Sequence, residues 1–169
     1  METNATPLQQ AKRPRTALAG PYGHPFHPIL VTIPIGAWIS SLIFALFALF
    51  GDDDEVWVQG SQLLIAIGVI MAVVAAIFGL MDLSVIPSGT PAKRTAFTHM
   101  ALNLTVVALF AVAYIIQAVS GVDDLNIASF VLVILGLAIL TVSGWLGGKL
   151  AYHYGVRVAA EETQVEGYR

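Results

Sequence analysis

Four long apolar segments, separated by short polar connections, dominate the sequence. They cover about residues 28–50, 61–83, 96–119 and 126–148. Each is long enough to cross a hydrocarbon layer of about 30 Å, which takes about 20 helical residues. Short connections make successive helices antiparallel neighbours. The pattern therefore predicts an all-α membrane protein, a four-transmembrane-helix bundle with up-down-up-down topology.

The polar flanks complete the predicted organisation. Residues 1–22 form a basic N-terminal arm that we expect to be disordered. The transmembrane domain covers residues 23–158, and residues 159–169 form a polar C-terminal tail. The first and third spans share no convincing residue pattern, so we predict no internal repeat.

Two proline-containing stretches predict where helices bend and end. Pro34, followed by Gly36, lies about two turns into the first span and predicts a kink there, with the freed carbonyls facing protein or water. The turn Pro87-Ser88-Gly89-Thr90-Pro91 ends the second span.

Composition places the chain in lipid and narrows its chemistry. The sequence is 57% hydrophobic and only 11% charged, against about 25% charged in a soluble domain. It contains no cysteine, which excludes disulfides, thiolate metal sites and a catalytic thiol. No basic patch interleaved with aromatic residues is present, so nucleic acid is not an expected partner.

The basic residues lie at one set of helix ends. They are Lys12, Arg13, Arg15, Lys93, Arg94, Lys149, Arg157 and Arg169. The first and third connections contain none of them and are acidic. Because basic residues beside a span are retained in the cytoplasm, we predict cytoplasmic N- and C-termini in a multi-pass protein of the plasma (inner) membrane.

This orientation gathers the histidines at the cytoplasmic end. The motif His24-Pro25-Phe26-His27-Pro28 enters the first span, and His99 enters the third, with Asn103 four residues later on the same face. Asp82 lies near the end of the second span, and His153 follows the fourth. Ionisable residues inside a membrane are costly and often functional. The candidate site therefore comprises His24, His27, Asp82, His99 and His153.

Each candidate also has a structural interpretation, which the sequence leaves open. The first two histidines can cap a helix at the lipid headgroups, and the third can join helices by hydrogen bonds. Asp82 can form an ion pair with Lys149 or Lys93. His153 lies between two tyrosines, which is typical of an interfacial belt.

Imidazoles with one carboxylate suit Zn, Fe or Cu, whereas Mg and Ca prefer oxygen ligands. The predicted metal ligands are His24, His27, His99 and Asp82. Asn103 is expected to complete the ligand set or to orient an imidazole by a hydrogen bond. Lys149 is expected to lie in the shell of residues that surrounds the ligands. A transition metal is therefore one expected cofactor.

Haem is the other expected cofactor, and it imposes a different geometry. Its two axial histidines approach from opposite faces, so His24 and His27, three residues apart, cannot serve together. His99 can serve with either His27 or His153. All four histidines are therefore candidate cofactor ligands.

Several stretches together resemble a known family. They are HPFHPILVTIPIG, GLMDL followed by PSGTPAKR, THMALN, and GWLGGKLAYHYGVRV. Over about residues 23–158, this combination resembles the bacterial membrane-protein family called domain of unknown function 2231. The resemblance implies a four-span module whose recurrent marks are His24, His27, Asp82, His99, Asn103, Gly147 and Gly148. Some relatives are joined to Rieske-type iron–sulfur domains, which implies electron transfer.

Three functions are compatible with the sequence. The leading hypothesis is a membrane module that binds a transition metal or haem and transfers electrons with a redox partner protein. The second is a non-catalytic subunit whose polar cluster locks the bundle or docks a partner, including a homo-oligomer. The third is a small transporter, although the outer halves of the spans hold few polar side chains. No nucleophile elbow or phosphate loop predicts an enzyme, and the lipid bilayer is a partner in every case.

Overall fold

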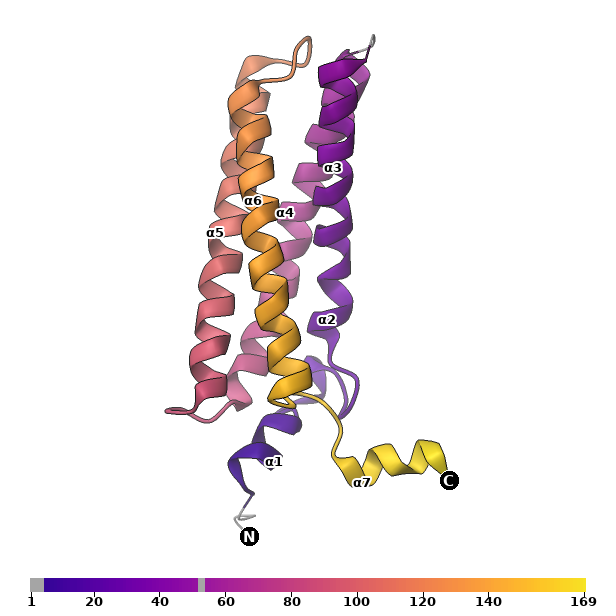
Figure 1. The fold of residues 1–169 in the computed structure, drawn as a ribbon, viewed down its shortest axis with the longest axis vertical. Helices are drawn as coiled ribbons and strands as arrows, with labels where there is room; N and C mark the ends of the chain where they lie inside the picture. Colours follow the sequence, from indigo (N-terminus) through magenta and orange to yellow (C-terminus); the bar gives the residue numbers. More distant parts are fainter. Residues whose placement is uncertain (1–4, 52–53) are drawn as a thin grey trace.

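The computed structural model describes residues 5–51 and 54–169, and the described residues are helical with connecting turns. Four helical stretches are long and apolar enough to cross a membrane, namely Phe26–Phe50, Glu55–Val85, Pro91–Ser120 and Ile127–His153. They run up, down, up and down, so both ends of the chain lie at the same end of the bundle (Figure 1). We call this the terminal end. The predicted four-helix membrane fold is confirmed.

The first span consists of two helices in line. Helix α2 (Phe26–Leu30) ends at Val31, and α3 (Thr32–Phe50) begins directly after it. The interruption lies one turn before Pro34, which has no N–H to donate and whose ring would crowd the carbonyl four residues earlier. The hydroxyl of Thr32 donates to the carbonyl of Ile29 at 2.7 Å and so satisfies part of the broken ladder.

The remaining spans begin and end at residues that favour turns. Helix α4 (Asp54–Val85) stops before the predicted proline turn, and α5 (Pro91–Ser120) starts after Thr90, whose hydroxyl accepts a hydrogen bond from the Lys93 amide. Helix α6 (Ile127–Gly148) is capped by Asn126 and continues into one π-helical turn, η2 (Lys149–His153). Within the acidic connection expected at residues 52–55, residues 52 and 53 lie outside the described residues.

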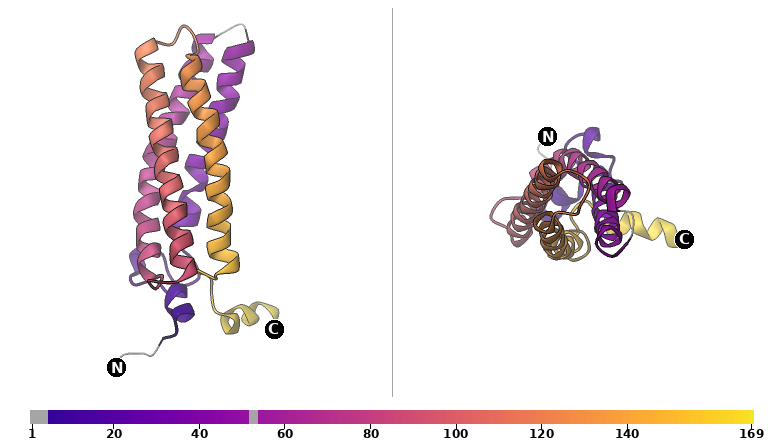
Figure 2. Two further views of the ribbon diagram at one scale, coloured as in Figure 1. Left: turned by 60° about the vertical axis from the view of Figure 1, so that its left-hand side comes forward. Right: turned by 90° about the horizontal axis from the view of Figure 1, so that it is seen from above.

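The N-terminal arm differs from the sequence-based expectation of disorder. Its described part, residues 5–22, contains α1 (Pro7–Lys12) and the short helix η1 (Ala17–Ala19). Thr6 and Gln9 form a capping box at the start of α1. The C-terminal tail contains α7 (Glu161–Gln164) and η3 (Val165–Tyr168), which lie to one side of the bundle (Figures 1 and 2).

The core is narrow, and most large apolar side chains face outward, as expected in lipid. The buried cluster at the centre consists of Trp38, Ile65, Val106, Phe110, Ala113 and Val133. On the outside, Phe50, Val119 and Trp145 are each about four-fifths exposed. Seen along the bundle, the four long helices surround this core (Figure 2). Helix α3 packs mainly on α4 and α5 mainly on α6, so the bundle consists of two hairpins.

Both hairpins bury an aromatic ring against a glycine. We call α2, α3 and α4 the first hairpin, and α5 and α6 the second. In the first, Gly68 leaves space for the ring of Trp38, which a Cβ at that position would overlap. In the second, a Cβ at Gly136 would lie 2.7 Å from the ring of Phe110. Close approach of ring and helix therefore requires glycine at both positions.

A buried serine joins the two helices of each hairpin. Ser61 Oγ on α4 donates to the carbonyl of Ser41 on α3 at 2.9 Å. Ser129 Oγ on α6 donates to the carbonyl of Ala113 on α5 at 2.8 Å. Each of these residues in α3, including the aromatic one, has its counterpart in α5 the same number of positions later in the sequence. The serine and glycine of α4 likewise have their counterparts in α6, at a second fixed separation.

The two hairpins therefore form an internal repeat, and the prediction of no repeat is wrong. Trp38 and Phe110 are equivalent residues and stack on one another, with ring centroids 4.2 Å apart and planes 5° from parallel. Equivalent residues that touch mark the axis relating the two hairpins. Because α3 and α5 run in the same direction, this pseudo-two-fold axis is parallel to the helices (Figure 1).

Candidate functional site

His27 and His99 form a second pair of equivalent residues that face one another across the pseudo-two-fold axis. Their ring centroids are 6.4 Å apart, and the ring planes are nearly perpendicular at 89°. His27 lies in the first turn of α2 and His99 near the start of α5, so both are at the terminal end. Both side chains are half-buried. The structure thus brings together two of the predicted site residues.

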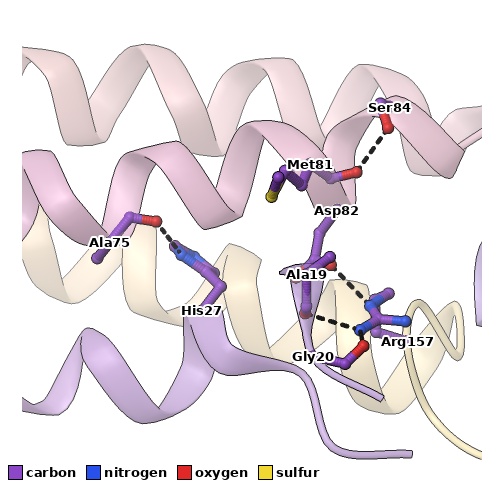
Figure 3. A network of polar contacts seen from close by, with 8 residues as sticks. All are labelled: Ala19, Gly20, His27, Ala75, Met81, Asp82, Ser84 and Arg157. Carbon is purple, nitrogen blue, oxygen red and sulfur yellow. Dashed lines mark hydrogen bonds and ion pairs between the residues drawn. The ribbon is translucent and has the colours of Figure 1, made fainter. Parts of the chain in front are cut away.

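The His27 ring is held against α4. Its Nδ1 lies 2.8 Å from the carbonyl oxygen of Ala75 (Figure 3). A Cβ added at Gly79, one turn further along α4, would lie 3.0 Å from Cε1 of the ring. Because a carbonyl only accepts, Nδ1 carries a hydrogen and donates it to Ala75.

The His99 ring is held against α6 in the same way. Its Nδ1 lies 2.8 Å from the carbonyl oxygen of Ser143 and therefore donates to it. A Cβ added at Gly147 would lie 3.1 Å from Cε1 of His99, which matches the position of Gly79 beside His27. The two imidazoles thus have equivalent hydrogen bonds and equivalent glycine neighbours.

Asn103 adds hydrogen bonds that only the second hairpin has. Its Nδ2 has two hydrogens and three acceptors within reach, and the longest of the three contacts, 3.1 Å, is with Nε2 of His99. The same amide nitrogen lies 2.7 Å from Ser143 Oγ and 2.9 Å from the carbonyl of His99. Asn103 thus contacts His99 through its amide nitrogen, which donates, and these contacts help to orient the ring.

Two of the four histidines lie outside this pair. The side chain of His24 is exposed in the turn before α2. That of His153 is also exposed, and its ring packs edge-on against Tyr154 with centroids 4.8 Å apart. Their predicted roles as cofactor ligands find no support in this arrangement.

Asp82 forms an ion pair with Arg157, and not with the lysines considered from the sequence. Arg157 Nε lies 2.7 Å from Asp82 Oδ1, and the side chains are 3% and 12% exposed (Figure 3). The two atoms do not align as a hydrogen bond, so charge holds the pair. Lys149 Nζ lies 5.6 Å from the centroid of a tyrosine ring, and Lys93 Nζ donates to a backbone carbonyl at 2.7 Å.

Arg157 also ties the two ends of the chain together. Its Nη2 donates to the carbonyls of Ala19 and Gly20, each at 3.0 Å (Figure 3). Its backbone N–H donates to the carbonyl of Ala11 at 3.0 Å. The residue has a φ of 61°, in the left-handed region that costs a non-glycine residue about 1 kcal/mol or more. These contacts hold the backbone in that conformation.

Further bonds join the N-terminal arm to the segment after the last span. Lys12 Nζ donates to the carbonyl of Ala159 at 3.1 Å, and the Ala160 amide donates to the hydroxyl of Tyr22. We call residues 11–22 and 155–160 together the terminal cap. It lies at the terminal end of the bundle and contacts α4 through the ion pair of Arg157 with Asp82.

The predicted four-ligand metal set is not assembled. Within residues 5–51 and 54–169, no three His, Asp or Glu side chains are close enough to hold a metal ion. The exposed His24 and the Arg157-bound Asp82 leave only His27 and His99 as a pair. This arrangement offers two imidazoles whose Nε2 atoms can act as ligands.

Three contacts of the site were missed from the sequence. Ala75 and Ser143 act through backbone carbonyls, which carry no residue signature. Arg157 lies beyond the last span, and only the neighbouring Gly155, with φ of 68°, indicates that the chain turns back there. The equal spacing of histidine and following aromatic residue in the first and third spans was the available signal for the repeat.

A family model described as "Predicted membrane protein (DUF2231)" matches residues 23–160. The chain belongs to this family. The DUF2231 range contains all four membrane-length helices, the histidine pair, and both Asp82 and Arg157. The N-terminal arm, residues 1–22, lies before it. Comparisons with curated proteins and with solved structures gave no match.

Proposed function

We propose that this membrane protein holds a haem group between His27 and His99 and transfers electrons with a redox partner. The observation that carries the proposal is the facing imidazole pair, with centroids 6.4 Å apart. Each ring is fixed by an Nδ1–H bond to a backbone carbonyl, the arrangement that orients imidazole ligands of metals.

The spacing of the rings suits one shared metal centre. Metal–imidazole bonds of about 2.0–2.1 Å place the centroids of two imidazoles on one metal about 5–6.5 Å apart. A bare zinc or iron ion needs three or four protein ligands, whereas haem needs only two because the macrocycle supplies the others. The presence of two facing histidines and no third ligand among the described residues favours haem.

The residues of the chain have distinct parts in this proposal. His27 and His99 would hold the group through Nε2, and bound iron would supply one-electron chemistry. The carbonyls of Ala75 and Ser143 accept from Nδ1 and so fix the orientation of each ring. Gly79 and Gly147 present no side chain beside the rings.

The test is an absorption spectrum combined with metal analysis. We expect protein produced in haem-replete cells and purified in mild detergent to show a Soret band that His27→Ala and His99→Ala each abolish. His24→Ala and His153→Ala are matched controls, because these exposed histidines lie outside the pair, and should leave the band unchanged. Purified protein with neither a Soret band nor near-stoichiometric metal would contradict the proposal.

A structural role is the second candidate, and the complete hydrogen bonding of His99 favours it. Both ring nitrogens of His99 have partners, Ser143 and Asn103, so the residue can simply lock α5 to α6. Under this alternative the wild-type protein is colourless and metal-free. His99→Ala then lowers its melting temperature and changes no cofactor content.

The membrane orientation supports access to a cytoplasmic partner. We propose that the terminal end faces the cytoplasm, because every Lys and Arg of the sequence is near it. Single cysteines at Thr90 and Asp123, in connections at opposite ends, test this with an impermeant thiol reagent on intact cells. Labelling at residue 123 alone is expected, and labelling at residue 90 alone would reverse the orientation.

A further inference from the structure

The two imidazoles occupy equivalent positions but differ in what surrounds their ligand nitrogens. Nε2 of His99 lies 3.1 Å from Asn103 Nδ2 and shares the two N–H groups of that amide with Ser143 Oγ and the His99 carbonyl. Nε2 of His27 has no hydrogen-bond partner among the residues that the structure describes. The pair is therefore symmetric in its Nδ1 contacts and asymmetric in its Nε2 contacts.

The repeat identifies the residues responsible for this difference. Val31 is the counterpart of Asn103, four residues after the histidine in each first helix. Ala75 is likewise the counterpart of Ser143. The first hairpin thus has two apolar residues where the second has an amide and a hydroxyl, and only the second can build a polar network around its imidazole.

We infer that Asn103 masks the His99 ligand nitrogen and so determines whether the pair acts as one ligand or as two. In the masked state described here, His27 offers the open nitrogen. His27 would hold a metal centre first, and His99 would join it once the Asn103 amide turns away. The identity of that ligand rests on the proposed function, whereas the masking does not.

The exchange is chemically simple. The contact of Asn103 Nδ2 with His99 Nε2 would be lost, and the same lone pair of Nε2 would then be available to a metal centre. No proton or electron moves, because the ring proton stays on Nδ1 against the Ser143 carbonyl. The released amide keeps two other acceptors, Ser143 Oγ at 2.7 Å and the His99 carbonyl at 2.9 Å. Unmasking therefore leaves no buried donor without a partner.

Chemical modification of the ligand-free protein tests the masking directly. Diethyl pyrocarbonate acylates an imidazole nitrogen that has a free lone pair, and peptide mass spectrometry gives the rate at each histidine. We expect His27 to react about two- to tenfold faster than His99, the factor that corresponds to one hydrogen bond. The exposed His24 and His153 serve as internal standards for reagent access.

Exchanging the counterparts separates masking from burial. Asn103→Val copies Val31 and should bring the His99 rate up to that of His27. The reverse variant, Val31→Asn, should slow His27 and leave His99 unchanged. Circular dichroism and melting temperature establish that each variant is folded, and either variant alone decides the question. Equal rates at His27 and His99 in the wild type, or a His99 rate that Asn103→Val does not change, would overturn the inference.

Haemin titration then connects the masking to the proposed function. With haemin as the probe, Asn103→Val should bind about two- to tenfold more tightly than the wild type. If the modification rates follow the exchange but haemin binds neither protein, the masking stands and the haem proposal fails. If haemin binds both proteins equally and the modification rates do not change, the haem proposal stands and the masking fails.

Discussion

In the first hairpin a valine follows the histidine by one turn, whereas the second hairpin has Asn103 at that position. Around these positions the two hairpins share a serine-to-carbonyl bond, an aromatic ring on a glycine and an imidazole bonded to the facing helix. The comparison teaches that the repeated contacts build the scaffold. The side chains that differ between the hairpins give each imidazole its own chemical character.

The hairpins also end differently. Asp82, near the end of α4, is a buried charge paired with Arg157. Its counterpart near the end of the second hairpin is Leu150, which packs against Ile86 and Val156. The first hairpin therefore holds the terminal cap by charge, and the second holds it by apolar contact.

The largest expected effect comes from making these two ends alike. Asp82→Leu copies Leu150 and leaves the Arg157 guanidinium buried without a counter-charge, which costs about 3–5 kcal/mol. We expect the terminal cap to detach. Because the sequence has no cysteine, Ala19→Cys can report this: the 3%-exposed position should react slowly with a thiol reagent in the wild type and rapidly in the Asp82→Leu background.

Two controls accompany this prediction. The double variant Asp82→Leu with Arg157→Leu removes both charges and should recover much of the protection. Asp123→Asn, at an exposed site at the opposite end, should have no effect on labelling. Slow labelling of Ala19→Cys in both backgrounds would show that the ion pair does not hold the cap.

A smaller loss of stability is expected from the equivalent glycine substitutions, which should destabilise the two hairpins equally. Gly68→Ala and Gly136→Ala each push a methyl group into a buried aromatic ring, and overpacking of this kind costs about 1–3 kcal/mol. Thermal unfolding in detergent measures the loss. Gly144→Ala is the matched control, since no heavy atom beyond its own helix neighbourhood lies within 4 Å. A loss at only one of the two glycines would break the equivalence of the hairpins.

The smallest expected effect concerns the buried serines. Ser61→Ala and Ser129→Ala each remove one bond between the helices of a hairpin, worth about 0.6 kcal/mol in a membrane protein. Because the bonds are equivalent, the two losses in unfolding free energy should agree. Thr105→Ala removes a bond within a single helix and provides the comparison. Unequal losses at the two serines would show that the two hairpins share the geometry of these bonds but not their contribution to the unfolding free energy.

The spans and their ends were predictable because their causes are local. Continuous apolar residues, the proline turn and the Thr90 cap each act through neighbours in sequence. The proximity of His27 and His99 was predictable because both lie in the terminal halves of spans that run in the same direction. The repeat was not visible because its contacts use glycines and backbone carbonyls, which tolerate different side chains around them.

The order of the N-terminal arm and the partner of Asp82 had a common cause that sequence reading missed. Both depend on Arg157, which reaches Asp82 and the carbonyls of Ala19 and Gly20 at the same time. A polar, proline-containing arm has the composition of a disordered segment. Its structure comes from bonds to residues more than a hundred positions away, so local composition could not reveal it.

The joining of Arg157 to Ala19 and Gly20 fixes an order of assembly. The ribosome makes the N-terminal arm first and Arg157 only after the fourth span, and chains fold as they emerge. The terminal cap can therefore form only after Arg157 has been made, later than all four spans. Until then the carbonyls of Ala19 and Gly20 lack their guanidinium partner, and the carboxylate of Asp82 lacks its counter-charge.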